Sequence, residues 1–68
     1  MKGLSFNAMR VGLKYKLINF GELFEFEVIG PLQGDNLQLK DLNTLEQYEL
    51  YDLVKFGRGN DFEIREIG

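Results

Sequence analysis

The chain has 68 residues and a net charge of −3, and it contains no cysteine and no histidine. A chain of this length forms one domain with a limited core. The missing residue types exclude disulfides, thiolate and imidazole metal sites, and the commonest general base near neutral pH. We therefore expect neither catalysis nor a bound metal or cofactor. The lack of cysteine fits a reducing compartment, so we expect a cytoplasmic protein.

Apolar residues occur in runs of at most two. A membrane-spanning helix needs roughly 20 consecutive apolar residues, and the start of the chain has no apolar stretch long enough for a signal peptide. We therefore expect no contact with a membrane. The hydrophobic fraction of 44% is nevertheless too high for a disordered chain.

Residues 1–9 precede the first strand pattern, and we predict that they form an N-terminal extension. The extension is either a flexible tail or an extra strand that pairs with a sheet edge of the same or another copy. Residues 10–68 are predicted to be a single small β-barrel domain.

The first strand signal is an alternation of period two, which is typical of a half-buried strand. It covers residues 11–18 and puts four apolar side chains on one face: Val11, Leu13, Tyr15 and Leu17. A turn at residues 19–22 follows, with a glycine available for positive φ. Residues 24–29 alternate in the same way, with Phe24, Phe26 and Val28 on one face. The two runs predict a β-hairpin.

A second hairpin is predicted between residues 37 and 51. Residues 30–36 contain the single proline together with glycine and asparagine, which marks a break between strands. Leu37 and Leu39 then alternate with polar residues, residues 41–44 have the composition of a tight turn, and Tyr48 and Leu50 alternate after it.

The spacing of apolar residues changes near residue 50. Leu50, Leu53 and Val54 stand at i, i+3 and i+4, which predicts one short helical turn. Asp52 is the predicted cap of this turn and Gly57 its end. Residues 57–61 are predicted to be a loop, and residues 62–67 alternate again as a last strand.

Five short strands with one apolar face each predict an all-β fold. Two hairpins and a fifth strand can curl into a closed or nearly closed barrel, which hides the sheet edges. The predicted inward set is Val11, Leu13, Tyr15, Leu17, Phe24, Phe26, Val28, Leu37, Leu39, Tyr48, Leu50, Leu53, Val54, Phe62 and Ile64. The predicted outer faces carry opposite charges on neighbouring strands, which accounts for the basic start and acidic remainder of the chain without a ligand.

Four strands, a helical turn at residues 52–56 and a fifth strand form an order that resembles SH3-like barrels, a group that includes Tudor-like and KOW-like modules. The resemblance covers roughly residues 10–67 and implies a five-stranded barrel with one short helical turn before the last strand. Peptide-binding SH3 domains carry an Ala-Leu-Tyr-Asp-Tyr-type motif early in the chain and a tryptophan in their groove. Here the similar run at residues 49–53 follows the fourth strand, and the chain has no tryptophan. The resemblance therefore does not imply proline-rich ligands.

Several residue groups are candidates for chemistry or binding. Glu25 and Glu27 share one strand face, but a solvated face beside lysines neither raises a carboxyl pKa nor gathers metal ligands. In residues 57–61 two glycines allow close approach of a partner, and Arg58 can bind a carboxylate or phosphate through two parallel hydrogen bonds. The alternative is a helix stop followed by a turn into the last strand. Phe20 and Tyr51 are the aromatic residues expected to lie exposed and to form a binding patch.

These observations favour a small binding module for a protein or peptide, without catalysis. Its predicted partner-binding residues are Phe20, Tyr51, Arg58, Lys14 and Lys16. One alternative is a nucleic-acid-binding module of the KOW-like or Tudor-like kind, in which Lys14 and Lys16 contact phosphates. Another is a structural homodimer formed by edge strands or by the first nine residues.

Overall fold

The computed structural model describes residues 8–67. Five strands and one short helix form in these residues: β1 (Lys14–Asn19), β2 (Glu22–Pro31), β3 (Leu37–Asp41), β4 (Gln47–Glu49), α1 (Leu50–Leu53) and β5 (Glu63–Glu66). The prediction of an all-β fold with one short helical turn before the last strand is confirmed at this level.

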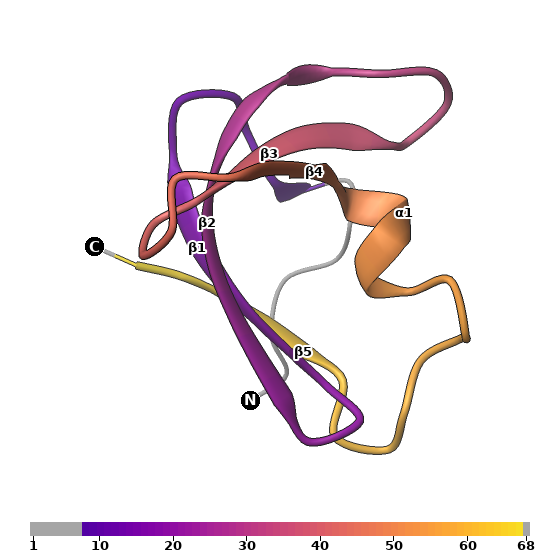
Figure 1. The fold of residues 1–68 in the computed structure, drawn as a ribbon. Helices are drawn as coiled ribbons and strands as arrows, with labels where there is room; N and C mark the ends of the chain where they lie inside the picture. Colours follow the sequence, from indigo (N-terminus) through magenta and orange to yellow (C-terminus); the bar gives the residue numbers. More distant parts are fainter. Residues whose placement is uncertain (1–7, 68) are drawn as a thin grey trace.

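All five strands belong to one sheet in the order β4-β3-β2-β1-β5, and each neighbouring pair is antiparallel. The first four strands follow one another along the sheet, and the last strand returns to pair with the first. Figure 1 shows β1 and β2 as a long twisted hairpin, with β3 and β4 beside one end and β5 crossing near the other.

The hairpin of β1 and β2 forms where period two predicts it. Its register places Tyr15 opposite Phe26 and Lys16 opposite Glu25. The two residues of the turn both have positive φ, 51° at Phe20 and 77° at Gly21. Such a turn matches the right-handed twist of the flanking strands.

The core lies on one face of the sheet. Most of the predicted inward set is buried or packs against the buried cluster: Tyr15, Leu17, Phe24, Phe26, Val28, Leu37, Leu39, Tyr48, Leu50, Leu53, Val54, Phe62 and Ile64. Met9 also belongs to the buried cluster, although the sequence places it in the extension. The packed part of the chain thus reaches at least one residue before the predicted boundary at residue 10, while residues 1–7 lie outside the described residues.

The prediction of Val11 and Leu13 as core residues is wrong, because their exposed fractions are 55% and 37%. β1 begins only at Lys14. Before it, the Gly12 amide donates to the Val28 carbonyl while the Val28 amide donates to the Leu13 carbonyl, so two residues face one on β2. Gly12 supplies the positive φ of 91° that this irregular pairing uses. The bulge breaks the alternation on which the prediction of burial rested.

The prediction of Asp52 as the helix cap is also wrong. Because β4 stops at Glu49, the helix begins at Leu50 with Glu49 as its N-cap. Asp52 is the third residue of the helix, and its carboxylate accepts a hydrogen bond from the Glu49 amide at 3.1 Å. Asp52 therefore stabilises the start of the helix as one half of a reciprocal capping box.

Candidate functional site

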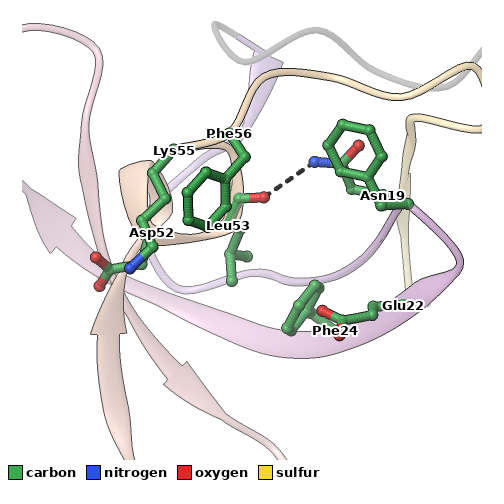
Figure 2. A pocket seen from close by; sticks show the side chains of 8 residues that line it. Asn19, Glu22, Phe24, Asp52, Leu53, Lys55 and Phe56 are labelled. Carbon is green, nitrogen blue, oxygen red and sulfur yellow. Dashed lines mark hydrogen bonds between the residues drawn. The ribbon is translucent and has the colours of Figure 1, made fainter.

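A pocket of about 320 Å³ opens between the β1–β2 turn and the segment around α1. Asn19, Phe20, Glu22 and Phe24 line it from the hairpin side, and Asp52, Leu53, Lys55 and Phe56 line it from the helix side. Figure 2 shows these two groups of side chains facing each other from different elements. We call this feature the aromatic pocket.

Three phenylalanines give the pocket its apolar surface. Phe20 is 59% exposed and Phe56 is 84% exposed, while Phe24 is half-buried against the core. Leu53 is also half-buried and packs against the core beneath them. Exposed aromatic side chains offer a large apolar surface, and a partner that covers this surface removes it from water, which favours binding.

The charges of the pocket lie near its two ends. In the view of Figure 2, Asp52 and Lys55 lie together at one end and Glu22 lies at the other. The Lys55 ammonium is 5.5 Å from the centre of the Phe56 ring, within the range of a cation–π contact. Among the lining residues Lys55 is the basic one and Glu22 and Asp52 are acidic, so the lining has a formal excess of one negative charge.

The Asn19 side chain ties the two walls together. It is 3% exposed and makes three hydrogen bonds to residues far along the chain. Its amide nitrogen donates to the Leu53 and Gly57 carbonyls, both at 3.0 Å, and its oxygen accepts from the Gly59 amide at 2.7 Å. The hydrogen bond to Leu53 is the dashed line in Figure 2. All of the polar groups of this buried amide are used inside the protein.

The Asp61 carboxylate holds the β1–β2 turn itself. One oxygen accepts from the Phe20 amide at 2.9 Å, and the other accepts from the Gly21 amide at 2.7 Å. Figure 1 shows the turn and the loop before β5 at the same end of the molecule. The loop at residues 57–61 is therefore fastened to the pocket wall.

Gly59 lets the Phe20 ring approach this loop. A Cβ atom on Gly59 would lie 2.9 Å and 3.1 Å from two atoms of the ring. The sequence predicted that the glycines of residues 57–61 either allow a partner to approach closely or end the helix. The prediction that Gly57 ends the helix is wrong, because α1 ends at Leu53 with Val54 as its C-cap. Gly57, with φ of 95°, instead closes a later turn in which its amide donates to the Val54 carbonyl. The group that approaches Gly59 is Phe20 of the same chain, so the close approach of a partner stays a prediction.

Of the predicted partner-binding residues, only Phe20 lines the aromatic pocket. Tyr51 is exposed, but its hydroxyl donates to Asp35 and its amide donates to the buried Asn36, so it fastens α1 to the loop before β3. The hydrogen bond to Asp35 raises the pKa of Tyr51. Tyr51 therefore does not line the aromatic pocket, and the predicted binding patch of Phe20 and Tyr51 is not found in its lining.

The basic candidates lie elsewhere. Lys14 and Lys16 are paired in register with Glu27 and Glu25 on the outer face of the hairpin. The Arg58 guanidinium lies 5.0 Å from the centre of a neighbouring aromatic ring in the loop before β5. These three basic residues do not line the aromatic pocket, whereas Phe20 does.

Sequence reasoning missed most of the pocket. Phe24 and Leu53 were assigned to the core alone, and Phe56 and Asn19 were not singled out. One signal was available: Phe56 directly precedes the glycine-containing loop at residues 57–61, and loops lie at the surface. The partners of Asn19 and Asp61 lie 34 to 41 residues away along the chain, and no local pattern indicates them.

Other polar groups in the described residues serve turns. Asp41 accepts from the Asn43 and Thr44 amides and from the Tyr48 hydroxyl. The two backbone hydrogen bonds are the main reason that the pKa of Asp41 is lowered. Within residues 8–67 no group of three or more acidic side chains is placed to hold a metal ion. In the same part of the chain, no helix has the length and apolar character required to cross a membrane.

No protein-family model matches the chain, and neither a curated protein nor a solved structure matches it.

Proposed function

We propose that this domain is a non-catalytic binding module that holds a short segment of a partner protein in the aromatic pocket. The observation that carries the proposal is the exposure of Phe20 and Phe56 on facing walls of a formed pocket. Exposed aromatic side chains that surround a concave site are typical anchors of protein recognition. The lining contains no cysteine, histidine, serine or threonine, which form the commonest pairs of nucleophile and base.

The fold that we propose together with this function is an SH3-like barrel. The element order of four strands, a short helix and a fifth strand is the order on which the resemblance rests. β5 pairs with β1, so β4 and β5 are the two edges of the sheet. The proposed barrel requires the sheet to curl until these two edges approach each other. Within this fold the pocket lies between the first hairpin and the helical turn.

The partner segment that fits best carries a basic side chain next to an apolar one. Lys55 lies beside Asp52, which leaves the Glu22 end of the pocket without a basic side chain in its lining. A lysine or arginine of the partner can place its charge near Glu22 and its stem against the Phe20 or Phe24 ring. A cation over an aromatic face contributes about 0.5–2 kcal/mol, depending on how far it is desolvated. The net charge of −3 favours the same partner at longer range.

The test is an NMR titration of the isotopically labelled protein with a short acetylated peptide that carries arginine and leucine. We expect shifts of backbone amide signals at Phe20, Phe24, Leu53 and Phe56, and weaker binding when glutamate replaces arginine in the peptide. A spectrum that stays unchanged with both peptides contradicts the proposal. Phe56→Ser serves as the variant of the protein, because this side chain is 84% exposed and its loss removes a pocket wall with little effect on folding.

The same titration with a single-stranded oligonucleotide tests the nucleic-acid alternative. Lys14 and Lys16 are each opposite a glutamate in the sheet, and these acids oppose binding of phosphates. We expect no shift of the signals of these two lysines. Shifts there that disappear as salt is added would favour nucleic acid over a peptide.

A further inference from the structure

We propose that Phe20 occupies its turn position for binding rather than for folding, and that Asp61 is the residue that holds it ready. The inference rests on the proposed function, because it concerns the wall of the same aromatic pocket. It identifies Phe20 as the main ligand anchor and Asp61 as a positioning residue that acts through the backbone of the turn.

The backbone at Phe20 is the first observation. Its φ of 51° lies in the left-handed region, and Gly21 follows with 77°. Residues other than glycine, asparagine and aspartate are disfavoured there, and the first position of this turn strongly prefers asparagine or glycine. A phenylalanine at this position therefore works against the stability of the hairpin.

Burial of the ring does not account for its presence. Phe20 is 59% exposed, so more than half of its surface remains in water. The remaining part lies against Gly59 and faces the pocket. A strained residue whose side chain is mostly exposed and lines a pocket is more readily explained by contact with a ligand than by the fold.

The Asp61 carboxylate stabilises this conformation of the turn through hydrogen bonds. Its two carboxylate oxygens accept from both amides of the turn, at 2.9 Å and 2.7 Å. Hydrogen bonds to a charged acceptor are stronger than those between neutral groups. These bonds fix the backbone of Phe20 and Gly21, and Gly59 leaves the space that the ring needs. The aromatic wall is thus arranged before a ligand arrives, which lowers the ordering cost of binding.

The experiment measures peptide affinity and unfolding separately in matched variants. For Phe20→Asn we expect an unchanged or higher midpoint of urea unfolding together with a Kd that rises about tenfold or more, as at an interface anchor. Phe20→Tyr keeps the ring and should retain the affinity. A Phe20→Asn variant that binds as well as the original protein, or whose unfolding midpoint falls clearly, overturns the role assigned to Phe20.

For Asp61, the variant is Asp61→Ala and its control is Asn60→Ala, at the exposed neighbouring position. We expect Asp61→Ala to remove the hydrogen-exchange protection of the Phe20 and Gly21 amides and to raise the peptide Kd, whereas Asn60→Ala does neither. Unchanged protection of both amides overturns the role of Asp61. If the original protein binds no peptide, the proposed function and the binding role of Phe20 fail together, and amide exchange in Asp61→Ala still decides whether Asp61 holds the turn.

Discussion

Replacement of Asn19 by alanine tests the connection between the two walls of the aromatic pocket. The Asn19 amide is 3% exposed and makes three hydrogen bonds, to the Leu53 and Gly57 carbonyls and from the Gly59 amide. A hydrogen bond contributes about 0.5–1.5 kcal/mol net, and a buried group left without its partner costs more. Asn19→Ala should therefore lower the free energy of unfolding by about 2–4 kcal/mol. The expected total for a domain of this size is only about 3–10 kcal/mol.

Urea unfolding followed by circular dichroism measures this loss. With a slope near 1 kcal/mol per molar urea, the midpoint should fall by about 2 M or more. Asn43→Ala is the matched control, because the Asn43 side chain is exposed and makes one long contact of 3.5 Å with Glu25. Its effect should stay within about 0.5 kcal/mol. If Asn19→Ala lowers the free energy of unfolding as little as this control does, the two walls are held by packing alone and the role given to Asn19 is wrong.

Three further predictions concern the fold. Phe26 has no exposed surface, so Phe26→Ala should cost about 3–5 kcal/mol and leave much of the protein unfolded at 25 °C; a cooperative thermal melt with an unchanged midpoint would contradict this. Asp52→Ala removes the acceptor of the Glu49 amide and should lower the urea midpoint slightly, by about 0.5–1 kcal/mol in unfolding free energy, while an unchanged midpoint would argue against the capping box. The pKa of Asp41 is lowered from its usual 3.8 in the folded state, so its contribution to stability is present above that value and lost as pH falls through the lowered pKa. Unfolding measured across this acid range should depend less on pH in Asp41→Asn than in the original protein, and identical pH profiles would refute the assignment.

The hairpins show how much of the fold the sequence predicts. Alternation of period two located β1, β2 and β5, because a strand with one buried face must repeat every second residue. The glycine in the turn after Asn19 indicated where β1 ends, because glycine extends the backbone angles that are available locally. The predicted break at residues 30–36 begins too early, because Gly30 and Pro31 still belong to β2 and pair with Gln38 and Leu37. Such local rules also place Lys14 and Lys16 on the outer face.

The same rules failed where the pairing partner decides the outcome. Val11 and Leu13 continue the apolar alternation, yet the bulge at Gly12 leaves both exposed. Asp52 is a residue type that often caps helices, but the helix begins at Leu50 because β4 ends at Glu49. In both cases the neighbouring strand, not the local sequence, fixes the boundary.

The sequence by itself determined a small β-sheet domain with charged outer faces and an exposed aromatic residue at the first turn. The aromatic pocket, by contrast, was decided by the tertiary structure alone. One wall comes from residues 19–24 and the other from residues 52–56. Asn19 joins the two walls through a hydrogen bond that spans 34 residues, and Asp61 fixes the turn of the first wall from 41 residues away. Alternation indicates which face of a strand is buried, but it carries no information about which distant segments lie across from each other. Their meeting depends on long-range contacts: β5 returns to pair with β1, and the Asn19 and Asp61 side chains form hydrogen bonds with backbone groups of distant segments.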